Sequence, residues 1–450
     1  MIHKNDHYEV EITGITAEGN GIAKIDGFIV FVPQTAVGDI VKIKIVKVLK
    51  NYGFGIIEQI VFPAKDRIEN DCSVFRQCGG CCWRHISYSS ELEIKWQQVR
   101  DCFERLGGFS LPPQPIVGSE KVVGYRNKAQ FPVGIDNTGK AIAGFFAKRS
   151  HRIISCLDCK LQPPVFNQIV KSVLDFINKY QITVYQEQAH TGIIRHIYLR
   201  QAEATKEIML CLVCAKKQFA HQKEFCETML SEFPQIKSII LNYNPDKTNV
   251  ILGKTCFTIA GSDTITDILC GVQVQISPLS FYQVNKEQAQ RLYQKAIIYA
   301  QLSDQDILLD LYCGIGTIGL SAAKPVKMLI GVEIIPQAVE NAKENARLNG
   351  FENTRFLCAD CKAAVKQLEE EHIKTDVIIV DPPRKGCDKD VIESICRIAP
   401  RKLIMISCNP ATAARDCKLL CEQGYQIEEY TPFDLFPRTS AIECVVKLIK

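Results

Sequence analysis

Long apolar runs are missing from this chain. None approaches the roughly 20 residues that a helix needs to cross a bilayer, and the segment Met1–Val10 is too polar for a signal peptide. Internal repeats and low-complexity segments are missing too. We therefore expect a cytoplasmic protein without a membrane partner. Nothing in the chain indicates an obligate protein partner, so we expect a monomer.

A strong charge of either sign is also missing. The formal net charge of +4 is compatible with binding to nucleic acid but does not by itself indicate it. The chain has 450 residues, of which 46% are hydrophobic and 23% charged, as in an ordinary globular protein. Because this length exceeds what one hydrophobic core supports, we expect about two or three domains.

Residues 1–62 show the pattern of a small all-β domain. Short β-branched runs such as Phe28–Val32 and Val41–Val48 are separated by glycine turns. Within the second run, three apolar residues alternate with two lysines, which puts an apolar row on one face and a basic row on the other; these residues are Val41, Lys42, Ile43, Lys44 and Ile45. A small barrel with one basic face is a common platform for nucleic acid. A merely solvated strand face is the alternative.

Cysteine is plentiful, with 21 residues, and clustered cysteines in a long chain indicate metal binding or catalysis before disulfides. Cys72, Cys78 and Cys81 are closely spaced around a Gly-Gly turn, as expected for thiolate ligands of a soft metal centre. Cys159 or Cys156 downstream would supply the fourth ligand. An iron–sulfur cluster takes four cysteines, and a structural zinc ion is the alternative. We assign this centre to a central α+β domain, residues 63–276.

Residues 277–450 alternate strands with helices, the pattern of a doubly wound parallel sheet. A strand at Ile307–Leu311 is followed by a G-x-G-x-x-G motif, and the next strand, Met328–Val332, ends on Glu333. Two further strands end before Asp360 and Asp381. This arrangement predicts a Rossmann-like domain that binds an adenosyl cofactor, with Glu333 holding the ribose hydroxyls.

The strand ends also bear on which cofactor is bound. Asp360 and Asp381 suit the adenine amino group and amide donors, whereas they would repel a pyrophosphate. A nicotinamide-dependent oxidoreductase, the alternative, would need a proton-transfer group, and no His or Lys stands at a strand end. The carboxylates therefore favour S-adenosylmethionine.

Cys408 lies at the centre of the segment IMISCNPAT. The short strand before it, Ile404–Ser407, is broken by Asn409 and Pro410, so Cys408 follows the carboxyl end of a strand, where open α/β sheets build their sites. A buried structural cysteine is the alternative to a catalytic one.

Five motifs together resemble the RNA uracil-5 methyltransferase family: FYQVN (Phe281–Asn285), DLYCGIGTIG (Asp310–Gly319), DPPRKG (Asp381–Gly386), SCNPAT (Ser407–Thr412) and the late Glu443. The pattern of Cys72, Cys78 and Cys81 resembles the iron–sulfur branch of that family, which acts on large-subunit ribosomal RNA. The resemblance spans nearly the whole chain and implies a TRAM-like barrel, a central domain and a Rossmann-like methyltransferase domain.

The resemblance also implies roles for individual residues. Cys408 would add as a thiolate to carbon 6 of uracil, which makes carbon 5 nucleophilic, and Glu443 would remove the proton from carbon 5. Asp381 would hydrogen-bond the uracil edge, and Phe281 would stack on a base taken out of its helix. The cofactor pocket would comprise Gln283, Tyr312, Thr317, Glu333, Asp360 and Asp381, and a [4Fe-4S] cluster would be held by Cys72, Cys78, Cys81 and Cys159.

The chain departs from the family pattern at three places. Cys444 follows Glu443 where Thr is usual, and Thr317 and Asp360 stand where relatives carry Asn. Two rival functions remain: a uracil-5 methyltransferase acting on transfer RNA, and a catalytically idle iron–sulfur protein that binds RNA. Cys408 and Glu443 are both present, which argues against an idle site.

Overall fold

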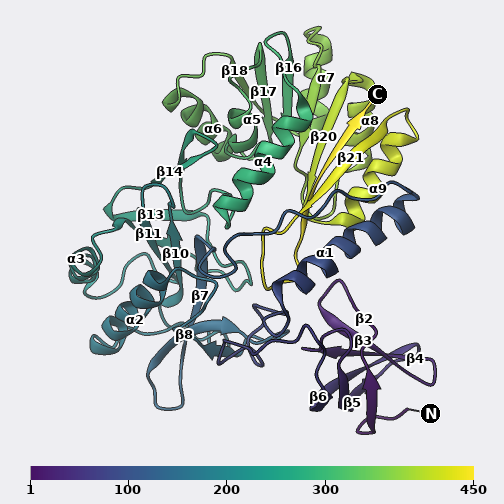
Figure 1. Ribbon diagram of the computed structural model, residues 1–450. Helices are drawn as coiled ribbons and strands as arrows, with labels where there is room; N and C mark the ends of the chain where they lie inside the picture. Colours follow the sequence, from purple (N-terminus) through teal and green to yellow (C-terminus); the bar gives the residue numbers. More distant parts are fainter. Residues whose placement is uncertain (1) are drawn as a thin grey trace.

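The computed structural model describes residues 2–450, and its N-terminal part is a six-stranded sheet wrapped round its own core (Figure 1). Val41, Ile43 and Ile45 are fully buried there, whereas Lys42 is exposed. The predicted alternation is therefore confirmed. The strands, in the sheet order β1-β5-β6-β4-β3-β2, are β1 (His7–Glu11), β2 (Gly14–Ile15), β3 (Asn20–Ile25), β4 (Phe28–Pro33), β5 (Ile40–Val48) and β6 (Tyr52–Phe62).

Helix α1 (Tyr88–Cys102) follows a loop that carries the first four cysteines, and a π-helical turn at Phe103–Gly107 extends it. Ser87 caps its first turn by accepting a hydrogen bond from the backbone N–H of Ser90 at 3.2 Å. The buried face of α1 and of the π-helical turn combines apolar and charged residues. Val99 and Phe103 are buried, but Leu106 is 55% exposed, and the charged Glu91 and Lys95 are fully buried.

The central part is a seven-stranded sheet in the order β13-β12-β11-β10-β7-β8-β9, with α2 and α3 packed on one face. A hairpin of β14 and β15 leads out of it. The elements are β7 (Lys128–Ile135), β8 (Ala141–Phe146), β9 (Ile153–Ser155), α2 (Pro164–Lys179), β10 (Ile194–Gln201), β11 (Ile208–Cys214), α3 (Gln222–Glu232), β12 (Ile236–Tyr243), β13 (Thr255–Gly261), β14 (Ile265–Leu269) and β15 (Val272–Ile276).

The C-terminal part is an α/β sheet in the order β18-β17-β16-β19-β20-β22-β21. Strands β16 to β20 are mutually parallel, and β22 runs antiparallel between β20 and β21. The elements are α4 (Lys286–Ala300), β16 (Ile307–Leu311), α5 (Thr317–Ser321), β17 (Met328–Glu333), α6 (Pro336–Leu348), β18 (Thr354–Cys358), α7 (Cys361–Glu370), β19 (Val377–Val380), α8 (Lys389–Ile398), β20 (Lys402–Ser407), α9 (Pro410–Cys421), β21 (Gln426–Phe433) and β22 (Glu443–Ile449).

Two hydrophobic cores cover the two faces of this sheet. Side chains of α4, α5 and α6 pack on one face, and those of α7, α8 and α9 pack on the other together with α1. Strand order reverses between β16 and β19, and ligands of open α/β sheets bind at the carboxyl ends of strands beside such a reversal. The fold is therefore the expected α/β methyltransferase arrangement. Within residues 2–450, no helix is long and apolar enough to cross a membrane.

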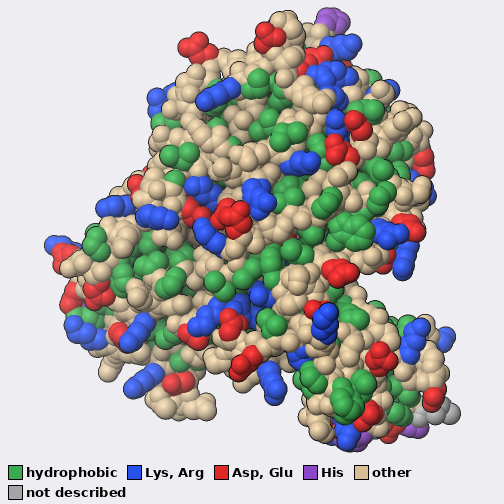
Figure 2. All heavy atoms as spheres, in the orientation of Figure 1, with side chains coloured by type: hydrophobic (Ala, Val, Ile, Leu, Met, Phe, Trp, Pro, Cys, Tyr) green, Lys and Arg blue, Asp and Glu red, His purple; other side chains and the backbone are tan. Residues whose placement is uncertain are grey.

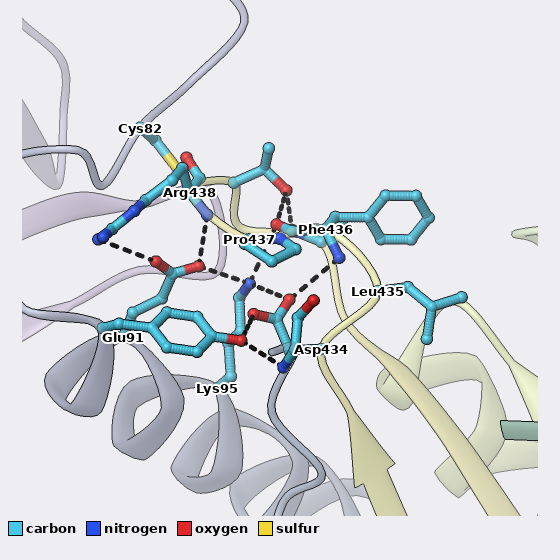
Figure 3. A network of polar contacts seen from close by, with 12 residues as sticks. Cys82, Glu91, Lys95, Asp434, Leu435, Phe436, Pro437 and Arg438 are labelled. Carbon is cyan, nitrogen blue, oxygen red and sulfur yellow. Dashed lines mark hydrogen bonds and ion pairs between the residues drawn. The ribbon is translucent and has the colours of Figure 1, made fainter. Parts of the chain in front are cut away.

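A buried ion-pair network joins α1 to the loop between β21 and β22 (Figure 3). The Lys95 ammonium donates to Glu91 Oε1 at 2.8 Å, to Asp434 Oδ1 at 2.7 Å and to the Phe436 carbonyl at 3.2 Å. Glu91 Oε1 also accepts the backbone N–H of Arg438 at 2.7 Å. The Lys95, Glu91 and Asp434 side chains are all fully buried. Because the loop leads directly into β22, the network fixes the point at which β22 begins.

Replacing Lys95 by Met should leave the buried Glu91 and Asp434 without the cation they share. We expect the free energy of unfolding to fall by about 3–5 kcal/mol, measured by urea denaturation. The matched control is Lys343→Met on α6, because Lys343 pairs with Glu340 in an exposed position and should contribute less than about 0.5 kcal/mol. A K95M chain as stable as this control would contradict the role of the network.

Candidate active site

The predicted catalytic side chains meet at the carboxyl ends of β19 and β20. Asp381 directly follows β19, and Cys408 follows β20 just before Asn409, whose side chain caps α9 by accepting the Ala411 N–H. Glu443 is the first residue of β22. Ser407 pairs with Cys444 across the antiparallel β20–β22 ladder, so the register one step further sets Cys408 opposite Glu443.

The charges of these groups influence one another. Burial, followed by the charges of Glu443 and Asp381, raises the pKa of the Cys408 thiol, and Arg384 lowers it, so that the pKa is about 11. Burial also raises the pKa of Glu443 well above its ordinary value, again with Asp381 adding to the effect and Arg384 opposing it. Burial raises the pKa of Asp381 to about 7.

A fourth acidic group lies beneath them. Asp310, on β16, is buried, and burial raises its pKa to about 8, with contributions from the charges of Asp381 and Glu333. Its Oδ2 accepts the Gly319 N–H at 2.8 Å, while its Oδ1 is buried without a partner. This unpartnered oxygen and the raised pKa values together describe a site that favours a cation.

Three of the predicted cofactor residues line one cavity of about 650 Å³ at the strand ends: Tyr312, Glu333 and Asp360. Glu333 accepts the backbone N–H groups of Gly314 at 3.1 Å and Ile335 at 3.0 Å, which holds its carboxylate beside the glycine loop. Asp360 caps α7 by accepting the Ala363 N–H at 2.8 Å. These contacts leave oxygen lone pairs on both carboxylates for a ligand.

The glycine loop brings the backbone close to this cavity. Gly316 has a φ of +84°, a left-handed conformation that side chains rarely adopt. A Cβ at Gly319 would lie 2.7 Å from Asp310 Oδ2, so the third glycine allows α5 to pack on β16. These are the roles that the glycines of a dinucleotide-type loop play.

Two more of the predicted cofactor residues, Thr317 and Gln283, lie near Tyr293 of α4. Burial and the charge of Asp381 raise the pKa of the Tyr293 hydroxyl, whereas hydrogen bonding with Thr317 and Gln283 lowers it. Thr317 and Gln283 are therefore neighbours of Tyr293, within reach of the Asp381 charge. Phe281, two residues before Gln283, is 66% exposed, so its ring is free to stack on a ligand.

The predicted metal ligands line a separate cavity of about 330 Å³ next to the central sheet. Its cysteines are Cys72, Cys78, Cys81, Cys156 and Cys159. The loop is pinned to β8 through the Gly79 N–H, which donates to the Phe146 carbonyl at 3.0 Å. A Cβ at Gly79 would lie 3.1 Å from that oxygen, so the close approach favours glycine.

An arginine and a coupled pair of thiols lie at the cysteine cavity. Arg84 lines it, and Arg84 Nη1 is buried without a partner. Hydrogen bonding from Cys156 lowers the pKa of Cys159 to about 6, which marks Cys159 as the thiolate of that pair. No three His, Cys, Asp or Glu side chains among residues 2–450 are grouped closely enough to hold a single metal ion, so the metal centre predicted for the central part is not shown.

Sequence patterns had not singled out Asp310 or Arg384 as site residues. Both lie inside motifs that were recognised, DLYCGIGTIG and DPPRKG. A charged residue buried inside a strand, as Asp310 is, was the available signal. Arg384 gave no such signal, because its proximity to Cys408 and Glu443 arises only from the fold.

Comparisons with known proteins agree with this geometry. A family model for tRNA (uracil-5-)-methyltransferase matches residues 271–450, and a TRAM domain model matches residues 4–57. An uncharacterized RNA methyltransferase of Halalkalibacterium halodurans is 41% identical over 99% of this chain and 98% of its own length. A similar protein of Clostridium tetani is 40% identical over 99% and 96%.

Among solved structures, the chain is similar to the tRNA (uracil-54, C5)-methyltransferase of Pyrococcus abyssi, determined in complex with S-adenosyl-L-homocysteine. The TM-score is 0.79 at 26% sequence identity, covering 98% of this chain and 100% of that one. The family matches, the full-length relatives and the shared fold lead to one conclusion. The chain belongs to the S-adenosylmethionine-dependent RNA uracil-5 methyltransferases.

Proposed function

We propose that this enzyme methylates carbon 5 of a uridine in 23S ribosomal RNA through a covalent bond between Cys408 and carbon 6 of the uracil. The observation that carries the proposal is the placement of Cys408 opposite Glu443, with Asp381 beside both. These three groups match the three tasks of the reaction: nucleophile, base and hydrogen-bonding partner of the pyrimidine. We expect the reaction in the cytoplasm.

The first task is attack by sulfur. The Cys408 thiolate forms a bond to carbon 6, and the electron pair of the carbon 5–carbon 6 double bond moves toward carbon 5 and the carbon 4 oxygen. With a pKa of about 11 the thiol is mostly protonated at neutral pH. Arg384 is the cation that lowers this pKa, so we assign it the role of positioning and stabilising the thiolate.

The second task is proton removal. After carbon 5 has taken the methyl group, the Glu443 carboxylate accepts the carbon 5 proton, and the electron pair expels the Cys408 sulfur to restore the double bond. Burial and the charge of Asp381 raise the pKa of Glu443, and Arg384 opposes them. Positive charge that enters the site would lower this pKa and favour the carboxylate that the task requires.

The third task is to hold the ring. Asp381 has a pKa of about 7, so both of its protonation states are present near neutral pH. It can therefore donate a hydrogen bond to the uracil edge or accept one from it. The exposed Phe281 ring would stack on the base once it has left its helix.

S-adenosylmethionine supplies the methyl group and carries the positive sulfonium. The chain's own residues fit it: Asp310, Asp381 and Glu443 have pKa values raised by burial and favour a cation. We assign Glu333 to the ribose hydroxyls and Asp360 to the adenine side of the cavity. The remaining residues of the pocket would be Tyr312, Thr317 and Gln283.

We also propose a [4Fe-4S] cluster on Cys72, Cys78, Cys81 and Cys159. Thiolates around one zinc ion lie within about 4 Å of one another, and no such group occurs among the described residues. A four-iron cluster holds its ligands further apart, and the unpartnered Arg84 Nη1 would offset its negative charge. Hydrogen bonding to Cys159 raises the pKa of the Cys156 thiol. We therefore regard Cys156 as a neighbour of the cluster and not as a ligand. The cluster would support folding or RNA binding, since the methylation involves no electron transfer.

We place the domain boundaries after residues 62 and 276. Transfer RNA is the second candidate substrate, because the similar Pyrococcus abyssi enzyme acts on it. Mass mapping of 23S ribosomal RNA and of transfer RNA, each from cells with and without the gene, decides between the two. Loss of 5-methyluridine from transfer RNA alone would reject the ribosomal assignment.

Incubation with RNA containing 5-fluorouridine should join the enzyme and the RNA covalently, because the fluorine blocks release of the adduct. The adduct should be absent in Cys408→Ala and should map to position 408 by mass spectrometry. In Glu443→Gln, ordinary uridine should also yield a long-lived adduct. Cys358→Ala, which removes an exposed cysteine at the end of β18, is the control and should behave as wild type. An adduct at another cysteine would overturn the mechanism.

The reactivity of Cys408 should report the charge of Asp381. As pH rises through about 7, Asp381 ionises and keeps the pKa of the thiol high. Asp381→Asn should therefore lower that pKa and speed alkylation of Cys408 by iodoacetamide at pH 8 by about three- to tenfold. Arg384→Gln should slow it. The alkylation of Cys358, followed in the same samples, provides the internal reference. Equal rates in all three proteins would show that these charges do not reach the sulfur.

Removal of one ligand tests the cluster. Cys78→Ala should reduce bound iron from about four atoms per chain to near zero, whereas Cys156→Ala should retain it. Iron, sulfide and zinc are measured in anaerobically purified protein. Stoichiometric zinc in wild type, or iron that persists in C78A, would contradict the assignment.

A further inference from the structure

A third cavity, of about 560 Å³, opens on the central part of the molecule between β7, the connection that follows β8, and the segment before β10. Its volume is in the range of small-ligand sites. Residues that line it include Pro132, Phe146, His151, Arg152, Tyr185 and His196. None of them belongs to the catalytic site or to the cysteine cavity.

His196 is the most unusual of these residues. Its side chain lies in the sheet with 8% of the residue exposed, and neither Nδ1 nor Nε2 has a hydrogen-bond partner. Burial lowers its pKa to about 4, so the ring is neutral and offers one donor and one acceptor. Pro132, its partner across the β7–β10 ladder, has no side-chain polar group to satisfy them. An unpartnered donor and acceptor at this depth destabilise the fold unless a ligand completes them.

A β-bulge directs this side chain. The register of β10 against β11 shifts between Ile194 and His196, so Arg195 is the extra residue of the strand. Ile194 and Ile197 consequently both pack into the core under α2 and α3, although they are three residues apart. Arg195 and His196 both line the cavity. Bulges that re-aim side chains are enriched beside functional sites.

The rim of the cavity combines aromatic rings with fixed positive charge. Phe146 and His151 stack with ring centroids 5.2 Å apart, and His151 Nδ1 lies 2.7 Å from Glu187 across the mouth. The Arg195 guanidinium lies 4.5 Å from the Tyr185 ring. Arg195 is held there by donating to the Asn244 and Asp246 carbonyls. Aromatic faces beside arginine suit a nucleobase and its phosphate.

Strand β10 connects this cavity to the catalytic site. Further along the same strand, the Tyr198 hydroxyl donates to the Pro278 carbonyl at 3.3 Å, and Arg200 donates to the Ser280 carbonyl at 3.0 Å. Ser280 immediately precedes Phe281. Four residues of strand separate His196 from Arg200, roughly 13 Å. On this spacing, an RNA whose target uridine sits at Phe281 would come within a few nucleotides of the cavity.

We propose that this cavity binds a second, unpaired nucleobase of the RNA substrate, with His196 contacting the base edge and the Phe146, His151 and Tyr185 rings enclosing its faces. The proposal rests on RNA being the substrate. It adds a recognition site away from the uridine that reacts. It also gives a function to a buried histidine whose ring nitrogens otherwise have no hydrogen-bond partner.

Two variants at one position test this. His196→Leu fills the same space without polar atoms, so the protein should be at least as thermally stable as wild type, yet its affinity for in vitro transcribed 23S ribosomal RNA should fall about tenfold. His196→Gln keeps a donor and an acceptor and should recover part of the affinity. His221→Asn, which alters an exposed histidine on the α3 side, is the matched control. A transfer RNA pool is tested in parallel.

Binding is measured without S-adenosylmethionine, so the outcome does not depend on methylation. When RNA that contains 4-thiouridine is irradiated with ultraviolet light, it should crosslink to peptides 146–152 or 184–188 of the wild-type protein. These crosslinks should be absent in His196→Leu. Unchanged affinity for both RNAs in His196→Leu, or crosslinks confined to other regions, would overturn the inference. If instead the proposed function is wrong, neither RNA should gain 5-methyluridine. The loss of affinity in His196→Leu and the crosslinks of the wild-type protein would then still be observed.

Discussion

The candidate active site depends on one constraint: its acidic side chains are buried away from water. Asp381 and Glu443 lie near Cys408 at the carboxyl ends of the parallel strands, Asp310 lies near Asp381, and burial raises the pKa of every one of them. Such a site favours a cationic partner over a phosphate, which explains why one glycine-loop fold serves a sulfonium here.

Much of this site could be predicted because parallel strands bring their carboxyl ends to one edge of a sheet. The residues that follow successive strands, Glu333, Asp381 and Cys408, are found there. The alternation in Val41–Ile45 predicted a buried row for the same kind of reason, since side-chain direction in a strand has a period of two. These inferences need only local patterns and one rule of sheet geometry. The role of each residue in the reaction stays a prediction.

Other features depend on contacts between distant segments, which no local pattern reveals. Glu91 and Lys95 stand four residues apart on a helix, as an exposed ion pair does, and only Asp434, over 300 residues away, makes a buried network of them. His196 lies in a strand that mixes apolar and charged residues, and the bulge that turns it is a property of the pairing with β11. The surface charge adds little to these predictions, because Lys and Arg are interspersed with Asp and Glu on the face shown (Figure 2). In the same view, a notch separates the N-terminal sheet from the rest of the molecule.

The position of β22 has a consequence for how the molecule is assembled. This strand lies between β20 and β21, although it follows both in the chain. Until β22 arrives, β20 presents an open edge to other polypeptides, which is a hazard for aggregation, and β21 has no neighbour to pair with. The strand that seals this edge also begins with Glu443. A molecule that has not yet inserted β22 would lack both the closed sheet edge and the carboxylate that we propose as the base.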